Sequence, residues 1–268
     1  MKYFLYITLL FCTPTLLAQS KKQLDVEKEL KEIVKEADML FTYRMVEWWG
    51  SEFTEDDKEL DRQVSDYLIY HDSDKFYFVL IDDSYKNKAG TYFIDFNNEE
   101  ANIQFDSTQS KLNKQERKLY QIQNRMNLQA SELVKKELVE KEGFSVSTIL
   151  IKQKRGYKLY LLSNTRDVDV IPLGNDAVFH GNNRGKIKKW NWYHKELLPI
   201  PISREGIRLA THKHGESQPL ISPTEIANFR LYGLLYGMLN LPILIENEGL
   251  LLEYESYDNR VNAYYPKQ

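Results

Sequence analysis

The sequence predicts an α+β protein with antiparallel sheets, an N-terminal amphipathic helix, a long central helix and a C-terminal helix packed on sheet. Apolar residues recur at three- and four-residue steps in two long segments, which is typical of helices. Elsewhere they alternate with polar residues between short turn sequences, as in antiparallel strands. No G-x-G-x-x-G or G-x-x-x-x-G-K-[ST] follows a strand-like segment. A parallel nucleotide-binding sheet is therefore not expected.

Residues 1–18 have the layout of a secretory signal peptide. Lys2 precedes an apolar run over residues 3–17, and Ala18 supplies the small residue expected at a cleavage site. The run is shorter than the roughly 20 residues of a membrane-spanning helix, and Pro14 interrupts it. We expect cleavage after Ala18 and export to the periplasm or the medium, with no integral membrane span afterwards. An uncleaved anchor is the alternative.

Cysteine and charge limit the class of protein. Cys12 is the single cysteine of the 268 residues, so the mature chain can form no disulfide and no thiolate metal site. A chain of this size can be held by its hydrophobic core alone. The formal charge is −3, and it becomes −4 when Lys2 leaves with the signal peptide. The absence of a basic excess argues against a nucleic-acid partner.

The first predicted helix follows the signal peptide and ends near Gly50. Its apolar stripe is formed by Leu30, Ile33, Val34, Ala37, Leu40 and Phe41. Trp48 and Trp49 stand at the predicted end. Such a pair can form a ligand platform, but packing against a core is the commoner role.

A meander of three or four antiparallel strands is predicted from Asp66 to Phe105. Its turns are HDSD and SYKNKAG, and they contain or adjoin Asp72, Asp74, Asp82 and Asp83. The loop-and-glutamate spacing of a calcium-binding hand is missing, so turn formation explains these aspartates better than calcium does.

A second long helix is predicted over roughly 109–141, with Gly143 as its stop. A domain boundary, if there is one, is expected at its start. The units would then be 19–108, with the first helix and the meander, and 109–268, with the long helix and a C-terminal α+β unit. A single domain is the alternative.

The C-terminal half is again rich in predicted strands. They are STILI, YKLYLL, DVDVIPL, DAVFH and KIKKWNWYH, separated by turns that include Gly174-Asn175 and GNNRG. These turn signals at short spacing favour an antiparallel sheet.

Residues 211–229, THKHGESQPLISPTEIANF, contain the candidate site. His212 and His214 lie at i, i+2, so an extended chain places both imidazoles on one side, where they can share a metal. Glu225, one turn into the following helix, can point back as a third ligand. Three protein ligands leave a position for the water of a hydrolytic zinc centre. Ser222 stands beside it.

This segment resembles the signature of the JAMM/MPN metallopeptidases, His-x-His, seven residues and Ser-x-x-Asp. The resemblance implies zinc as cofactor, His212, His214 and Glu225 as its ligands, and Ser222 as a catalytic group that stabilises the oxyanion. It extends to the helix predicted from Pro223 to about Asn240 and the strands LPILIEN and GLLLEYES. The whole chain also resembles secreted proteins of Bacteroidetes-type bacteria, which implies export and no particular activity.

The sequence departs from the family pattern at three points. Glu225 stands where the family has Asp, and Gly215 where it usually has proline. The family's general-base glutamate has no counterpart, because there is no Glu between Glu142 and Glu196. Asp167 and Asp169 are substitutes that the spacing does not require. His180, His194 and His71 are the remaining histidines of the mature chain.

A structural explanation competes with the zinc hypothesis. Ser222-Pro223-Thr224-Glu225 has the pattern of a capped helix start, with Ser at the N-cap, Pro at the first position and Glu closing a capping box. Two functions therefore stand. One is a secreted zinc-dependent hydrolase of amide or isopeptide bonds. The other is a non-catalytic envelope or extracellular module that binds an unknown protein, peptide or glycan through the aromatic-rich meander. A carboxylate of Glu225 folded back onto the Ser222 amide, together with a His212 side chain that faces away from His214, favours the second.

Overall fold

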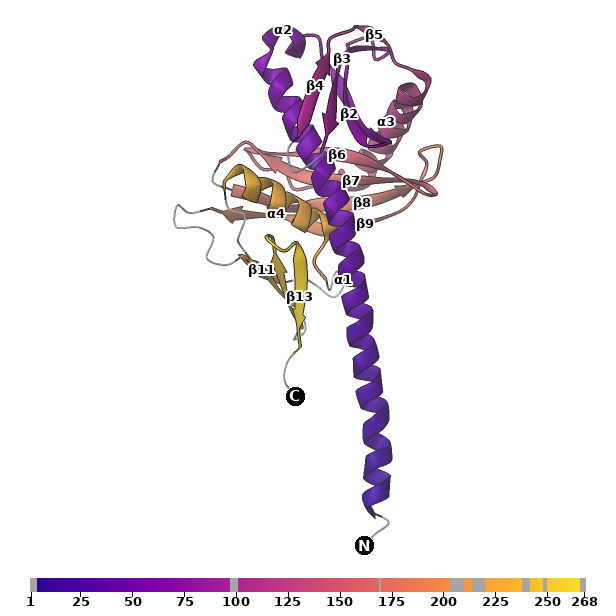
Figure 1. The fold of residues 1–268 in the computed structure, drawn as a ribbon, viewed down its shortest axis with the longest axis vertical. Helices are drawn as coiled ribbons and strands as arrows, with labels where there is room; N and C mark the ends of the chain where they lie inside the picture. The colour runs from indigo at the N-terminus through magenta and orange to yellow at the C-terminus, as the bar shows by residue number, and fades with distance from the viewer. Residues whose placement is uncertain are drawn as a thin grey trace.

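The α+β class with antiparallel sheets is confirmed by the structure, a computed structural model (Figure 1). It describes residues 4–96, 101–168, 170–202, 210–213, 220–237, 242–247 and 250–265, and for 4–23, 210–213 and 242–247 only the backbone is described. Three sheets and four helices make up this described part. None of the helices in it is long and apolar enough to cross a membrane.

The first helix, α1 (Phe4–Asp56), is longer than predicted and passes all three sheets (Figure 1). The predicted end near Gly50 is wrong. A Cβ atom at Gly50 would lie 2.5 Å from the Phe78 ring, so the glycine permits close packing against a strand rather than ending the helix. The chain then turns at Asp57, which caps the short helix α2 (Lys58–Asp61).

The predicted meander forms the first sheet, in the order β1-β2-β3-β4, with β5 also paired to β3. Its strands are β1 (Asp66–Asp72), β2 (Lys75–Ile81), β3 (Asn87–Asp95), β4 (Asn102–Asp106) and β5 (Ser110–Lys111). The turn between β2 and β3 is shorter than predicted, because Asn87 already belongs to β3. Asp82 accepts hydrogen bonds from Ser84 and Asn87 in this turn, which fits the predicted turn role.

The central helix is shorter than predicted, spanning α3 (Lys114–Val134) rather than 109–141. Its start is set by Asn113, which forms a capping box with Glu116, while the preceding residues pair with β3. The predicted stop, Gly143, lies nine residues beyond the end of the helix and leads into β6 with a φ of 81°.

The second sheet has the antiparallel order β6-β7-β8-β9. Its strands are β6 (Phe144–Gln153), β7 (Gly156–Thr165), β8 (Val170–Gly181) and β9 (Ile187–Pro201). The predicted turn at Gly174-Asn175 is wrong, since β8 runs through it with a shift of register. Gly174 and Asn175 have φ angles of 78° and 49° and lie opposite a bulge of β9, where Asn175 faces two residues of that strand, instead of reversing the chain.

The third sheet has the order β10-β11-β12-β13 and lies next to α4 (Pro223–Leu235) (Figure 1). Its strands are β10 (Ala210–Lys213), β11 (Pro242–Asn247), β12 (Leu250–Glu255) and β13 (Arg260–Tyr264). The β10–β11 pair is parallel, because α4 lies between the two strands in sequence and carries the chain back. The helix ends at Leu235 rather than near Asn240, with Gly237 at a φ of 69° closing its last turn.

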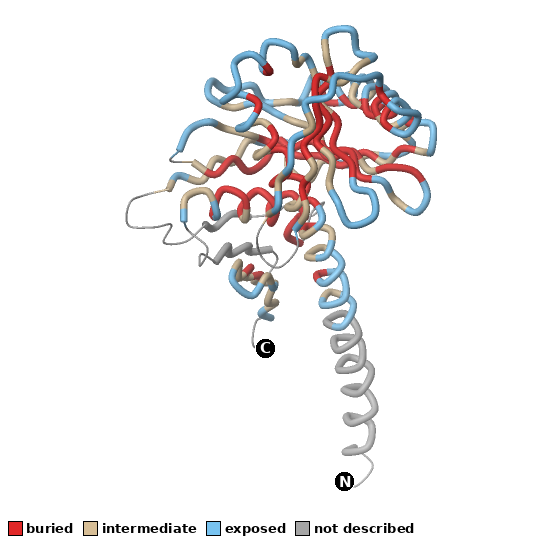
Figure 2. Tube along the Cα trace, turned by 45° about the horizontal axis from the view of Figure 1, so that its top comes forward, coloured by how far each residue is buried: buried red, intermediate tan, exposed pale blue. Residues whose placement is uncertain are grey.

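Buried residues gather where α1, the first two sheets and α4 meet (Figure 2). One hydrophobic cluster contains Leu40 and Val46 of α1, Phe78 of β2, Tyr160 of β7 and Ala227 of α4. Residues from both sides of the expected boundary at 108/109 thus belong to the same cluster. The packing places the first turn of α4 directly against β8 and β9 of the second sheet.

Candidate functional site

The first turn of α4 carries the predicted capping box. Ser222 Oγ accepts a hydrogen bond from the Glu225 amide at 3.1 Å, and the Ser222 amide donates to Glu225 Oε2 at 2.7 Å. Both side chains are buried, with exposed fractions of 0% for Ser222 and 1% for Glu225. The carboxylate therefore folds back onto the Ser222 amide, the geometry that favours the structural explanation of these two residues.

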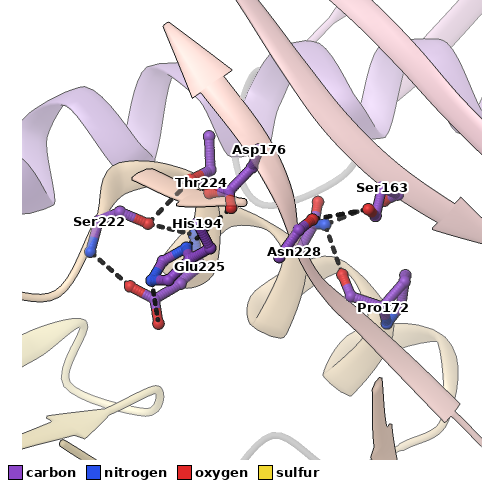
Figure 3. A network of polar contacts seen from close by, with 9 residues as sticks. Ser163, Pro172, Asp176, His194, Ser222, Thr224, Glu225 and Asn228 are labelled. Atoms are coloured by element: carbon purple, nitrogen blue, oxygen red, sulfur yellow. Dashed lines mark hydrogen bonds and ion pairs between the residues drawn. The ribbon is translucent and has the colours of Figure 1, made fainter. Parts of the chain in front are cut away.

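A buried carboxylate on β8 extends this network. Asp176 Oδ2 accepts a hydrogen bond from the hydroxyl of Thr224. The Ser222 and Thr224 hydroxyl oxygens lie 2.8 Å apart, and because the Thr224 proton goes to Asp176, Ser222 is the donor between them. The hydroxyl proton of Ser222 is thus engaged within the protein (Figure 3).

Asp176 also binds His194, its neighbour across the sheet. The two residues are in register between β8 and β9, and the His194 Nδ1 lies 2.8 Å from Asp176 Oδ1. The Nε2 atom of the same imidazole lies 3.6 Å from Glu225 Oε1. His194 is therefore held between two carboxylates, one on the sheet and one on the helix (Figure 3).

The electrostatics of this arrangement favour the imidazolium. Burial alone would lower the pKa of His194, but the charges of Asp176 and Glu225 and the hydrogen bond to Asp176 outweigh burial and raise the pKa to about 9. The positive end of the α4 dipole adds to the stabilisation of the two carboxylates. At neutral pH we therefore expect a cation with a carboxylate on either side.

The bulge between β8 and β9 aims Asp176 at this network. A Cβ atom at Gly174 would lie 1.9 Å from the Glu196 carbonyl oxygen, so only glycine fits there. The side chain of Asn175 is buried and donates to the Val139 carbonyl at 2.6 Å, which anchors the bulge to the segment after α3. The backbone irregularity thus places Asp176 opposite His194.

A second contact ties α4 to the same strands. The Asn228 amide donates to the carbonyl oxygens of Ser163 and Pro172, at 3.0 and 2.9 Å (Figure 3). Ser163 in turn donates to the Gly174 carbonyl at 2.6 Å. The polar groups of this interface position α4 on the second sheet.

Of the predicted site residues, the described structure brings together Ser222 and Glu225. His212 lies in β10, in parallel register with Ile245, and its side chain is not described, while His214 lies outside the described residues. Of the substitute bases, Asp167 is exposed between β7 and β8 and Asp169 lies outside the described residues. His71 is exposed on β1, and His180 lies on β8 opposite Lys189.

The described groups do not present a free zinc-ligand set. Glu225 Oε2 accepts from the Ser222 amide, and a protonated His194 has no lone pair for a metal. Within the described residues, no group of three or more His, Cys, Asp or Glu side chains is arranged to hold a metal ion. No catalytic step through zinc follows from this geometry.

Sequence reasoning missed Asp176 and Thr224 and gave His194 no defined role. Gly174-Asn175 looked like a turn, so Asp176 was placed at a turn edge instead of inside a strand. The sequence does contain an Asp and a His, Asp176 and His194, on two neighbouring predicted strands. Only the register shift between β8 and β9 makes these two side chains face each other.

A separate candidate surface lies on the face of the first sheet next to α1. Phe53, Phe96 and Phe105 have exposed fractions of 41%, 38% and 42%. Phe53 and Phe105 both contact the ring of Tyr92, at centroid distances of 5.9 and 4.5 Å, and Phe96 stacks on Trp49 at 5.7 Å. We call Phe53, Phe96 and Phe105 the aromatic face.

Comparisons of the chain with protein-family models, curated proteins and solved structures returned no match. The resemblance to the metallopeptidases therefore stays a prediction from the sequence motif.

Proposed function

We propose that this chain is an exported, non-catalytic module that binds an envelope or extracellular protein or glycan through the aromatic face. The observation that carries the proposal is the exposure of three large rings on one side of the meander. Isolated apolar residues are common on protein surfaces, but a contiguous exposed group is typical of an interaction site. Export is proposed on the signal-peptide pattern of residues 1–18.

The hydrogen bonds that Ser222 and Glu225 make within the protein support a role without catalysis. The serine hydroxyl donates to Thr224, the glutamate caps the helix, and both are buried. A catalytic group has to reach its substrate. Each contact of these two residues is explained by the attachment of α4 to the second sheet.

The construction of the aromatic face supports binding. Phe96 is fixed from below by Trp49 and Phe76, and Phe105 lies against Tyr92. Rings held in place lose little conformational entropy on binding. Aromatic rings also offer flat apolar surface to sugar rings or to apolar side chains of a protein.

The first test uses purified peptidoglycan sacculi as the glycan probe. The mature chain, residues 19–268, should sediment with sacculi, and the double variant Phe53→Ser/Phe105→Thr should lower the bound fraction at least tenfold. Leu128→Ser is the matched control, because Leu128 is 69% exposed on α3 and lies beside Ile187 and Trp190 of the second sheet, outside the aromatic face. Equal sedimentation of all three proteins would contradict binding through the aromatic face.

The second test addresses a protein partner. A photo-crosslinking phenylalanine analogue placed at Phe53 in the producing cell should give one discrete cross-linked species, and the same group at Leu128 should give none. If neither sacculi nor cross-linking reports on Phe53, the proposal is wrong.

A zinc-dependent amide or isopeptide hydrolase is the second candidate. It is favoured by one arrangement: a histidine whose Nδ1 is held by Asp176 and whose Nε2 faces Glu225 has the orientation that carboxylates impose on metal-binding histidines. Zinc would have to displace the proton of His194 or use His212 and His214 with Glu225.

Elemental analysis separates the two candidates. The mature chain, purified without chelator, is compared with His214→Ala and with His71→Ala as a matched control, because His71 is exposed at the end of β1. Near-stoichiometric zinc that is lost only in His214→Ala would establish the hydrolase candidate and justify assays on peptidoglycan and isopeptide substrates. Absence of zinc from all three proteins, with stability unchanged by added zinc, would exclude it.

A further inference from the structure

One edge of the second sheet is exposed at the start of β6, a strand that also contacts β1 and α1. β6 pairs with β7 along its length and forms the end of the sheet order. In the described part of the chain, no backbone hydrogen bond joins residues 145–147 to any element other than β7. Ser145 and Val146 are exposed at this edge. An open strand edge offers unpaired N–H and C=O groups to another extended chain.

Two clefts meet at this edge, one on either face of the sheet. A cleft of about 710 Å³ lies on the side of α1 and α4, and one of about 600 Å³ lies on the side of α3. Tyr67, Val146 and Ser147 line both of them. The edge of β6 therefore runs between two hollows.

The side chains of β6 confirm which face each cleft occupies. Ser147 Oγ accepts from the Arg44 guanidinium of α1 at 3.4 Å, whereas Thr148 Oγ1 donates to Asn127 of α3 at 2.9 Å. Successive residues thus point to α1 and to α3. An added strand would direct its own side chains alternately into the same two clefts.

The charges around the clefts favour a basic occupant. Their lining contains six acidic and three basic residues, a net charge of −3: Glu47, Glu52, Glu55, Asp66, Glu132 and Glu140 against Arg44, Lys135 and Arg166. Glu47, Glu55 and Glu132 are paired with Arg44, Arg166 and Lys135, which leaves Glu52, Asp66 and Glu140 as the acidic excess of the lining. Glu132 and Glu140 stand at the α3 cleft, whose walls include Ala130, Val134 and Leu161. The methylene chain of a lysine can lie against these apolar walls while its ammonium group stays at the rim of the cleft.

The α1 cleft also contains a buried donor. Arg44 has an exposed fraction of 3%, and its Nε has no hydrogen-bond partner in the described structure. Its Nη1 binds Glu47 at 2.6 Å. A buried donor without an acceptor is costly, so an arriving acceptor group that reached it would be stabilised.

We propose that the open edge of β6 binds an extended peptide carrying basic side chains, by addition of a strand beside Ser145–Ser147. The peptide backbone pairs with β6, and its alternate side chains enter the two clefts. None of the three residues of the aromatic face lines this site. The proposal therefore goes beyond the function proposed above. Its tests do not depend on whether Phe53, Phe96 and Phe105 bind a partner.

The probe is an eight-residue, end-capped peptide that alternates lysine with valine. It is compared with the same peptide carrying glutamate for lysine, and with two forms N-methylated on either the odd or the even residues. We expect the lysine peptide to bind at least tenfold more tightly than the glutamate peptide. One N-methylated form should bind and the other should fail, because only alternate N–H groups of an edge strand face its neighbour.

The matched protein variants reverse charge at one cleft only. Glu132→Lys/Glu140→Lys should reverse the preference between the lysine and glutamate peptides. Glu59→Lys, on exposed α2, should leave the preference unchanged. Hydrogen exchange should slow at the amides of residues 145–147 on binding and stay constant at β9, the opposite edge of the sheet.

Four results would overturn the proposal. Equal binding of the lysine and glutamate peptides excludes the charge selection, and equal loss of binding with both N-methylated forms excludes strand addition. No binding of the lysine peptide, or protection of residues 145–147 in a dimer of the free chain, removes the peptide as occupant. In the last case, the edge would belong to an interface between two copies.

Discussion

The buried imidazolium of His194 makes a measurable contribution to stability that depends on pH. The pKa of His194 rises from 6.5 to about 9 on folding, because the Asp176 and Glu225 carboxylates outweigh the cost of burial. Each pKa unit corresponds to ~1.4 kcal/mol. The raised pKa therefore corresponds to roughly 3 kcal/mol of folding free energy.

The direction of the effect follows from proton binding. Above pH 6.5 the unfolded chain has lost the proton that folded His194 retains, so folding takes up a proton and becomes less favourable as pH rises. The contribution is fully present below pH 6.5 and is lost as pH passes through about 9. The unfolding free energy of the mature chain should fall over this interval.

The measurement is urea unfolding, followed by tryptophan fluorescence at half-unit steps from pH 5.5 to 9.5. His194→Gln keeps a donor beside Asp176 but cannot be charged, so the difference between native and variant isolates the ionisation of His194. His71→Gln serves as the control, because His71 is exposed on β1. The native-minus-variant difference should shrink by roughly 3 kcal/mol between pH 6.5 and 9. A difference that stays constant with pH would refute an imidazolium between two carboxylates.

Further variants test the bulge, the attachment of α4 and the cap of α3. Gly174→Ala should abolish the native fold or cost more than about 4 kcal/mol, because its Cβ would meet the Glu196 carbonyl at 1.9 Å. Gly143→Ala has a similar positive φ and open space around it, so thermal unfolding should report only about 1–2 kcal/mol of backbone strain. Ser222→Ala should cost about 1 kcal/mol through loss of the helix cap. Thr224→Val should cost more than Ser222→Ala, up to about 3 kcal/mol, because it leaves buried Asp176 without one of its donors; a loss no larger than that of Ser222→Ala would contradict the network. Glu116→Ala should destabilise the chain by about 1–3 kcal/mol in chemical denaturation, since it removes the α3 capping box and unpairs Lys88.

The sequence alone determined the elements whose signals are local. Alternation of apolar residues predicted the meander and most strands of the second sheet, and the Ser222-x-x-Glu225 pattern predicted the capping box that the structure contains. Capping and side-chain alternation depend on residues a few positions apart. Such features can be read from one sequence.

Local signals failed wherever a distant contact decides the outcome. Gly50 looked like a helix end, but its small size serves the Phe78 ring, which approaches from another element. Gly174-Asn175 looked like a turn, but pairing with β9 keeps β8 extended through it. The positive φ that glycine and asparagine accept is the same in a turn and in a bulge.

The candidate sites were decided by the tertiary structure. Asp176, His194 and Glu225 come from two strands and a helix, and their approach depends on a one-residue register shift that periodicity cannot reveal. The two clefts beside β6 likewise form only where α1, α3 and α4 pack around one sheet edge. Helices, strands and caps are specified by neighbours in sequence, whereas charge networks and clefts are specified by neighbours in space.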